Sequence, residues 1–342
     1  MNTLFLGLAV VIIAAVFQGS FAVPMAYART WKWENSWLVF SIFGMIVFNL
    51  LFALVSLPDL VQIYRTVSPG ELLLPIIFGL IFGISAITFG LGITSLGFAL
   101  GYAIMIGTVI GLGTFIPMVV LHPEEILTGK GILILIGLLT VFIGIGFSAY
   151  AGIQKEREQG KMAGEITKDA RFSLKVGILI CVINGVCASS INIGFSVSRS
   201  LVDAAMFLGA HEDWAGNAIW AVLFTSGGVL NILYCAYLLG VNKTASYYKA
   251  KGSLKNLIFL FLMSAIWIGS FILYGVGATM MGTWGTVFGW PVYMILAIAV
   301  ANLWGIIQGE WHGTSFETKM LMAKALGILF FAAVIFIFGG IL

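Results

Sequence analysis

Ten apolar runs separated by shorter polar segments make up most of the 342-residue chain. A helix of about 20 apolar residues is long enough to cross the hydrocarbon core of a bilayer. Backbone groups in lipid must be hydrogen-bonded within their own segment, so the pattern predicts an all-α integral membrane protein with ten transmembrane helices. The runs cover residues 3–23, 36–56, 72–91, 97–120, 131–151, 176–198, 217–239, 256–276, 284–308 and 320–341.

One strongly charged segment, Gln154–Lys175, divides the runs into five and five. In both groups the first two connections are long, the third is very short and the fourth is about ten residues. Because five is an odd number, the second group must cross the membrane in the opposite direction. The pattern predicts two inverted five-helix repeats, residues 1–153 and 176–342, joined by a loop over residues 154–175, as in many secondary transporters.

Composition excludes a soluble domain. The chain is 61% hydrophobic and 9% charged, with a mean hydropathy of +1.08, whereas soluble domains carry roughly 25% charged residues. The three cysteines all lie inside apolar runs and predict no disulfide framework. The basic residues lie in connections, where they determine topology, so we expect a lipid bilayer and no nucleic acid as partner.

The basic residues predict the orientation. If the N-terminus is outside, the cytoplasmic connections carry 14 of the 17 Lys and Arg residues, and the outer connections carry only Arg65, Lys130 and Arg199. The positive-inside rule then places both termini outside the inner (plasma) membrane and segment 154–175 in the cytoplasm.

No enzyme motif is present. His122, His211 and His312 lie far apart in connections, there is no phosphate-binding glycine loop, and no Ser/His/Asp set lies at one depth. We therefore expect a protein that is not an enzyme and has no cofactor beyond a coupling cation.

Neutral polar and aromatic residues inside the spans are the candidate solute site. Amides in lipid need hydrogen-bond partners, so they either pair helix to helix or line a wet cavity. Aromatic rings beside amides suit a sugar, whose C–H face stacks while its hydroxyls form hydrogen bonds, and would equally suit an uncharged drug. No Asp, Glu or His lies in the middle of a span, which favours a neutral solute. The candidates are Gln18, Ser85, Asn184, Asn192, Trp267, Tyr274, Trp290 and Tyr293.

Proton coupling needs a group whose charge changes during the transport cycle. The acids lie near span ends, so we expect Asp203 first and Glu34 second. Arg199 precedes Asp203 by four residues, and on a helix the two would pair, which favours a structural role for Asp203. If neither acid matters, neutral oxygens such as those of Ser189 and Asn192 could hold Na+.

Glycine and proline residues inside the spans predict local geometry. Pairs four residues apart, such as Gly79 and Gly83, allow helices to approach closely. Pro291 lies within the ninth span, where a proline predicts a kink or a break.

The segment Trp31–Trp37, WKWENSW, which follows Pro24, resembles the start of the second helix in the L-rhamnose–proton symporter family. Residues 78–101, FGLIFGISAITFGLGITSLGFALG, are similar to that family's third and fourth helices. Further matches are Gly227-Gly228 with Asn231, Trp267 with Tyr274, and Trp290 with Gly305 and Glu310-Trp311.

The resemblance covers nearly the whole chain and implies the ten-helix inverted-repeat fold of the drug/metabolite transporter superfamily. It implies uptake of a deoxy sugar with a cation, H+ or Na+. It carries over Pro24, Trp33, Glu34, Trp37, Asn231, Trp267, Tyr274, Trp290, Glu310 and Trp311. The chain departs from the family at Thr94, where the family has a basic residue, at Ser85 in place of Asn, and at Asp203 in place of Glu. These departures leave the sugar and the coupling ion open.

The favoured function is therefore a secondary active transporter that takes up a neutral, rhamnose-like monosaccharide with a cation by alternating access. An efflux or exchange carrier for another neutral metabolite or drug, and a membrane sensor that binds the sugar without moving it, remain as alternatives. The oligomeric state stays open.

The orientation leads to a direct prediction. A cysteine placed at position 160 should react with a membrane-impermeant thiol reagent only after the cytoplasmic face is made accessible, because the segment is expected inside. Labelling of this cysteine from the periplasmic side of intact cells would contradict the predicted orientation.

Overall fold

All ten apolar runs form helices in a computed structural model of the chain, which describes residues 2–160 and 174–341. These residues contain no β-strand. The helices that form the spans are α1 (Asn2–Ser20), the continuous series α2 (Trp33–Phe40), η2 (Ser41–Phe48) and α3 (Asn49–Ser56), α5 (Pro69–Leu96), α6 (Phe98–Leu121), α7 (Gly129–Glu158), α9 (Leu174–Val197), α12 (Asn217–Asn242), α13 (Ser253–Met280), α14 (Gly285–Ile307) and α15 (Phe316–Ile341).

Short helices occupy several connections, and the sequence pattern did not predict them because they are too short to show a period. They are η1 (Val23–Tyr27), α4 (Leu60–Thr66), η3 (Pro123–Glu125), α10 (Arg199–Phe207), α11 (Glu212–Ala215), η4 (Thr244–Lys249) and η5 (Gly282–Trp284). Local capping explains where one of these short helices, α4, and the span helix that follows it, α5, begin. Asp59 accepts a hydrogen bond from the Gln62 amide at the start of α4, and Ser68 and Glu71 form a capping box at the start of α5.

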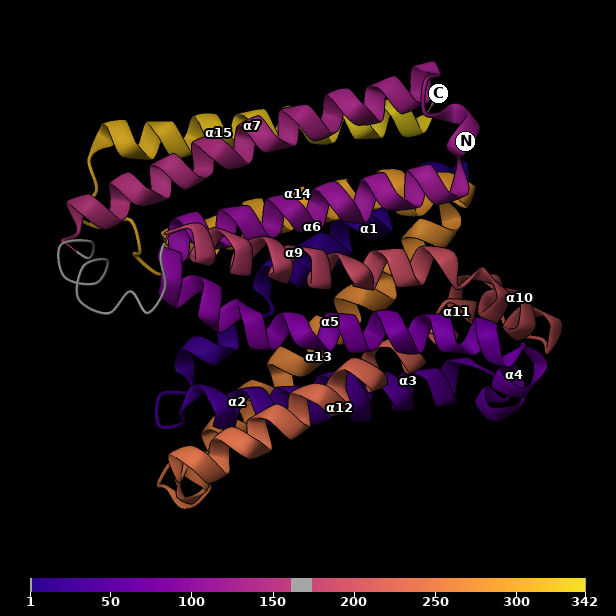
Figure 1. Cartoon of the computed structure of the whole chain (residues 1–342), viewed down its shortest axis with the longest axis horizontal. Helices are drawn as coiled ribbons and strands as arrows, with labels where there is room; N and C mark the ends of the chain where they lie inside the picture. Colours follow the sequence, from indigo (N-terminus) through magenta and orange to yellow (C-terminus); the bar gives the residue numbers. More distant parts are fainter. Residues whose placement is uncertain (1, 161–173, 342) are drawn as a thin grey trace.

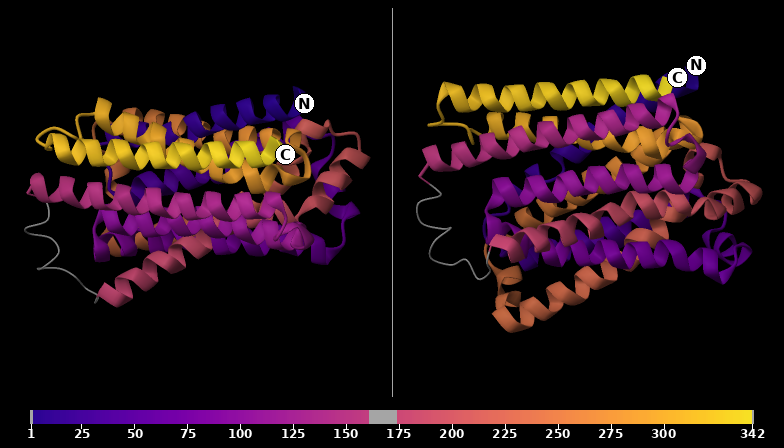
Figure 2. Two further views of the ribbon diagram at one scale, coloured as in Figure 1. Left: turned by 90° about the horizontal axis from the view of Figure 1, so that it is seen from above. Right: turned by 45° about the horizontal axis from the view of Figure 1, so that its top comes forward.

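The bundle has its helices roughly along its long axis, with α7 and α15 side by side at one edge (Figures 1 and 2). The start of α1 and the end of α15 lie at the same end of the bundle, and the end of α7 and the start of α9 lie at the opposite end. Ten crossings return the chain to the side on which it started, and the five crossings of the first half bring the end of α7 to the other side.

The main helix contacts join the two halves of the chain. Helix α9 packs along α5 and α6, and α1 packs along α13 and α14. Helix α12 packs against α5 and against all three parts of the second span. The core is therefore built from helices of both halves.

The second span departs from α-helical geometry in its middle. Eight residues, Ser41–Phe48, form a π-helix. The side chain of Asn49, directly after it, donates hydrogen bonds to the carbonyl oxygens of Met45 at 3.2 Å and Trp220 at 3.0 Å. This amide ties the irregular segment to α12 and supplies a donor for its carbonyl groups.

Part of the predicted loop 154–175 is helical instead. Helix α7 continues to Glu158, and α9 already begins at Leu174, while residues 161–173 lie outside the described residues. The charged end of α7 is stabilised because its side chains bind other helix ends. The Glu156 carboxylate accepts from the Ala99 amide of α6 at 3.1 Å, and the Glu158 carboxylate accepts from the Ser315 amide at 2.6 Å, just before α15.

Helix α14 is not broken at Pro291, contrary to the sequence-based expectation. The helix runs without interruption from Gly285 to Ile307. Proline removes one intrahelical hydrogen bond, from its own missing N–H to the carbonyl of Val287, and the packed surroundings of the helix tolerate that loss.

Glycines bring α5 and α12 into backbone contact, as the small-residue pair predicted. A Cβ added to Gly79 would collide with the Leu223 carbonyl and the Ser226 hydroxyl, and one added to Gly83 would lie 2.8 Å from the Gly227 carbonyl. The two helices can therefore lie this close only without side chains at these positions.

We expect Gly79→Ala to lower the free energy of unfolding by about 1–3 kcal/mol, because the added methyl group forces α5 away from α12. Gly90→Ala is the matched control on the same helix, since nothing lies within 4 Å of its Cβ position. The control should be neutral or slightly stabilising. Thermal unfolding in detergent measures the stability of both variants. Equal unfolding midpoints for Gly79→Ala and Gly90→Ala would contradict the close contact between α5 and α12.

Candidate functional site

Asn192 is the hub of a buried polar network near the middle of the bundle. Its side-chain amide donates to the carbonyl oxygens of Gly113 on α6 at 2.7 Å and Thr286 on α14 at 3.2 Å. Its Oδ1 accepts the hydroxyl proton of Tyr274 on α13 at 2.5 Å. Asn192 is 0% exposed, so one side chain on α9 joins three other helices without water.

A second set of hydrogen bonds runs through Ser270, one turn before Tyr274 on α13. Its hydroxyl donates to Gln18 Oε1 on α1 at 2.8 Å and lies 2.7 Å from the Tyr293 hydroxyl on α14. Gln18 is half-buried, whereas Ser270 and Tyr293 are 0% exposed. This set joins α1 to α13 and α14, which are two of the three helices that Asn192 binds.

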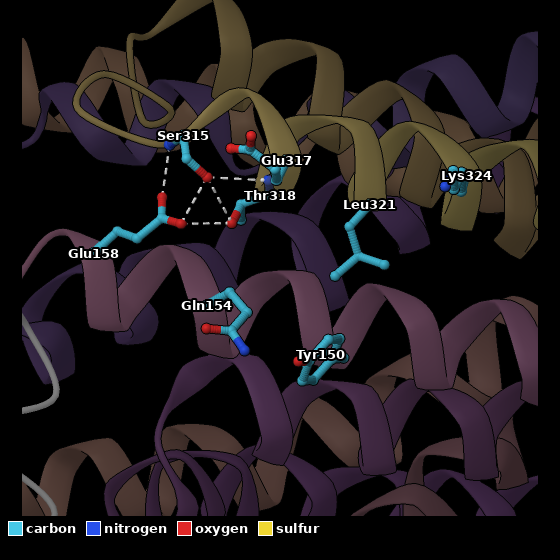
Figure 3. A pocket seen from close by; sticks show the side chains of 8 residues that line it. All are labelled: Tyr150, Gln154, Glu158, Ser315, Glu317, Thr318, Leu321 and Lys324. Atoms are coloured by element: carbon cyan, nitrogen blue, oxygen red, sulfur yellow. Dashed lines mark hydrogen bonds between the residues drawn. The ribbon is translucent and has the colours of Figure 1, made fainter.

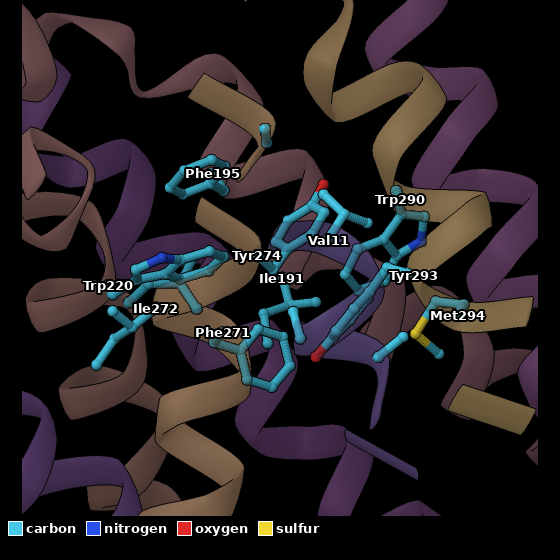
Figure 4. Packing of buried hydrophobic residues seen from close by; sticks show 14 of the residues in the cluster. Val11, Ile191, Phe195, Trp220, Phe271, Ile272, Tyr274, Trp290, Tyr293 and Met294 are labelled. Atoms are coloured by element: carbon cyan, nitrogen blue, oxygen red, sulfur yellow. The ribbon is translucent and has the colours of Figure 1, made fainter. Parts of the chain in front are cut away.

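Aromatic rings of α12, α13 and α14 pack together beside these polar groups (Figure 4). The Tyr274 ring lies 4.9 Å from that of Tyr293 and 5.4 Å from that of Trp290, centroid to centroid. Phe271 connects this group to Trp267, whose ring lies 5.0 Å away. The rings of Tyr274, Tyr293 and Trp290 are at most 1% exposed, so the centre is closed to solvent in this structure.

Six of the eight sequence-predicted solute residues therefore lie in one cluster, which we call the central cluster. They are Gln18, Asn192, Trp267, Tyr274, Trp290 and Tyr293. The other two, Ser85 and Asn184, lie elsewhere. The Asn184 amide donates to the Ser85 carbonyl at 2.5 Å and to the Thr88 hydroxyl at 3.1 Å, which joins α9 to α5. Ser85 and Asn184 therefore take part in a contact between two helices, which was one of the two possibilities considered for polar residues inside the spans.

Glu34 is a buried carboxylate at the start of α2. Its Oε1 accepts hydrogen bonds from the Asn242 amide at 3.1 Å and the Thr244 hydroxyl at 2.7 Å. Glu34 is 7% exposed and has no ion-pair partner among the described residues. The carboxylate thus holds the start of α2 to the end of α12 through neutral donors only.

The surroundings of Glu34 are also hydrogen-bonded. The Asn35 amide donates to the Thr244 carbonyl at 3.0 Å, and the Tyr248 hydroxyl donates to the Asn35 carbonyl at 3.0 Å. Burial raises the pKa of Tyr248 to about 12, so this hydroxyl stays a donor at any physiological pH. Farther along α2, Trp37 donates its indole N–H to Asn231 at 3.1 Å, and Phe40 meets Trp267 edge-on at 5.1 Å. Helix α2 therefore connects Glu34 to the central cluster.

Asp203 lies outside the bundle core, on α10. Its side chain is 64% exposed and pairs with Arg199, four residues earlier, at 3.3 Å. This confirms the pairing that the spacing predicted. An exposed pair of this kind contributes little to stability.

Two hollows on the described part of the chain are lined by residues outside the central cluster. One of about 530 Å³ opens between α7 and α15, where the Glu158 carboxylate is fully engaged with Ser315 and Thr318 (Figure 3). A second, of about 650 Å³, is lined almost entirely by apolar residues of the second span and α13, with Trp214 beside it. None of the predicted solute residues lines either hollow.

Sequence reasoning did not single out two groups that the structure places in the cluster. Ser270 links Gln18 to Tyr293, and its spacing of four residues from Tyr274 was the available signal. Phe195 stacks on Trp220 at 4.2 Å, but an apolar residue in an apolar run carries no signal for such a role.

Ten membrane-spanning helices around a closed, neutral, polar and aromatic centre define a multi-pass membrane transport protein rather than an enzyme. The chain belongs to the L-rhamnose-proton symport protein family, whose model matches residues 1–341. Relatives that carry the name L-rhamnose-proton symporter include one from Yersinia pestis and one from Pectobacterium atrosepticum. The one from Yersinia pestis (strain Pestoides F) is 26% identical over 317 residues, which is 91% of this chain and 90% of its own. The one from Pectobacterium atrosepticum is 26% identical over 339 residues, which is 97% of each chain.

Removing the Tyr274 hydroxyl should destabilise the ligand-free protein. In Tyr274→Phe, Asn192 Oδ1 loses its donor in a site without water, which costs about 1–3 kcal/mol. Tyr237→Phe on α12 is the control, because Tyr237 is 65% exposed. Thermal unfolding in detergent separates the two variants, and an unchanged midpoint for Tyr274→Phe would mean that this bond does not hold α13 to α9.

Proposed function

We propose that the protein is a secondary transporter that takes up a neutral, rhamnose-like monosaccharide together with a proton by alternating access. The observation that carries this proposal is the central cluster, where neutral hydrogen-bonding groups and aromatic rings from helices of both halves meet in a chain of this family. The shared name of the two relatives supports the sugar and the coupling ion.

The cluster suits a neutral polyol. Its hydrogen-bonding groups are amides, hydroxyls and an indole N–H, each of which can bind a sugar hydroxyl. Its rings offer flat faces to C–H groups. A charged solute would leave its charge uncompensated there, because the cluster contains no ionisable group other than its two tyrosines.

The two halves, residues 1–153 and 176–342, are proposed to be inverted repeats, as in the drug/metabolite transporter superfamily. The symmetry of the contacts supports this. Helix α1 packs on α13 and α14, and the corresponding helix of the second half, α9, packs on α5 and α6. Helices α7 and α15, the last of each half, pack on each other. Exchanging the halves therefore reproduces the same set of neighbours.

We place both termini outside the inner membrane and segment 154–175 in the cytoplasm. The distribution of Lys and Arg supports this orientation, as does the position of both chain ends at one end of the bundle.

Glu34 is our candidate for the proton-carrying group, ahead of Asp203. A buried carboxylate bonded only to neutral donors can change its charge without breaking an ion pair. When protonated, it accepts less strongly from Asn242 and Thr244, and the start of α2 is released from the end of α12. Because α2 also contacts Trp267 through Phe40, protonation is linked to the solute site. Asp203 is exposed on α10 and is paired with Arg199. No hydrogen bond or ion pair among the described residues connects this pair to the central cluster.

Uptake of labelled L-rhamnose into proteoliposomes tests the function and the coupling. An imposed pH gradient, acid outside, should drive accumulation, and a sodium gradient alone should not. Glu34→Gln should lose gradient-driven accumulation but keep exchange of labelled for unlabelled sugar, because its amide cannot carry a proton. Asp203→Asn should behave like the unchanged protein.

The other outcomes have clear meanings. Accumulation driven by sodium alone, with both variants active, would replace the proton by Na+ held by neutral oxygens. Loss of accumulation in Asp203→Asn only would move the coupling role to that residue. Binding of the sugar without flux or exchange would contradict transport and favour a sensor.

A further inference from the structure

The indole N–H of Trp220 is a hydrogen-bond donor in the bundle core that has no acceptor within residues 2–160 and 174–341. Trp220 lies in the first turn of α12 and is 1% exposed. A buried donor without an acceptor destabilises the native state, and such groups are rare in folded proteins. The N–H therefore calls for an explanation beyond packing.

Packing alone does not require an indole here. Phe195 of α9 lies flat on one side of the ring system at 4.2 Å and 8°, Phe224 is stacked at 5.1 Å and 12°, and Phe271 meets it edge-on at 5.6 Å. A phenyl ring could take part in the same stack without burying an unpaired donor. What distinguishes tryptophan at this position is the N–H in the plane of the ring.

The indole nitrogen of Trp220 lies against the backbone of α13, one residue after Tyr274. A Cβ added to Gly275 would lie 2.7 Å from Trp220 Nε1, so the indole nitrogen faces α13 next to Tyr274. The rings of Trp220 and Tyr274 are 6.4 Å apart, and the Tyr274 hydroxyl binds Asn192. The ring of Trp220 is therefore a neighbour of the residue that binds Asn192.

Trp290, one of the two tryptophans of the central cluster, shows the contrast. Trp290 donates its N–H to the Val109 carbonyl at 3.3 Å, so this donor is already used within the protein. The indole N–H of Trp220 is the same kind of donor, but it has no acceptor among the described residues.

We propose that Trp220 is a specificity-determining residue whose indole N–H donates a hydrogen bond to one hydroxyl oxygen of the transported sugar. This inference rests on the proposed function, because it needs a hydroxyl-bearing solute in the central cluster. The aromatic neighbours cover the ring, so the sugar hydroxyl approaches in the plane of the indole, beside Tyr274 and Asn192. The Trp220 N–H then has a hydrogen-bond acceptor only when the sugar is bound.

The test combines removal of the donor with removal of sugar hydroxyls. Binding of L-rhamnose and of analogues in which one hydroxyl at a time is replaced by hydrogen is measured on the full-length protein in detergent. Trp220→Phe should bind L-rhamnose about tenfold more weakly, the size of one good hydrogen bond. One analogue should bind the variant and the unchanged protein equally, because the same bond is already missing from the sugar.

A second variant protects the test against a folding defect. Benzothienylalanine at position 220 keeps the bicyclic ring and replaces the N–H by sulfur. Its ligand-free unfolding midpoint should be unchanged or higher, since an unpaired donor is removed, while its affinity for L-rhamnose should fall about tenfold. Trp304→Phe is the control, because its N–H already binds Ser20 at 2.8 Å, and its sugar affinity should not change.

Three results would overturn the proposal. An equal loss of affinity for every analogue in Trp220→Phe, or unchanged affinity with benzothienylalanine, would assign the indole to packing alone while leaving the transporter intact. If the unchanged protein binds none of these sugars, the proposed function fails and this inference fails with it.

Discussion

The structure depends on one constraint, which is that polar groups inside a membrane bundle have no water to bind. Most buried amides and hydroxyls of the centre are bonded to another helix or to their own backbone. Asn192 shows the result, since one side chain binds α6, α13 and α14. The same requirement positions Asn49 against α12 and Glu34 against the residues that follow α12. Polar contacts thus determine which helices are neighbours, and glycines determine how closely they lie.

The closed centre has a consequence for solute binding. The Tyr274 hydroxyl and the Ser270 hydroxyl have protein partners in this structure. A sugar that binds at the proposed site would replace these bonds with its own, so the net gain from each exchange would be small. Moderate affinity of this kind suits a carrier, which must release its solute on the other side. By the same reasoning, a group without a protein partner, such as the Trp220 N–H, would contribute more to the choice between sugars than a group that must exchange one bond for another.

The spans could be predicted from the sequence because a long apolar run leaves little choice of structure in a bilayer. The gathering of Gln18, Asn192, Trp267, Tyr274, Trp290 and Tyr293 was predicted from residue type and depth. Depth alone did not distinguish Asn192, which bonds to three helices of the central cluster, from Asn184, which pairs α9 with α5, because both are amides inside apolar runs. Ser270 and Phe195 depend on which helix faces cross, and the π-helical segment 41–48 depends on tertiary contacts that a hydrophobic pattern does not contain.

The exchange of partners between the halves bears on how the protein is made. Helix α1 leaves the ribosome first, yet its main neighbours, α13 and α14, are synthesised more than 200 residues later. Until then its small-residue face, where Gly7 meets Gly277, has no partner within the chain. Membrane insertion of the helices and assembly of the bundle are therefore separate events. A chain that stops after α7 would hold five inserted helices without a finished core, and the nascent first half must remain in the bilayer, protected from wrong pairings, until the second half arrives.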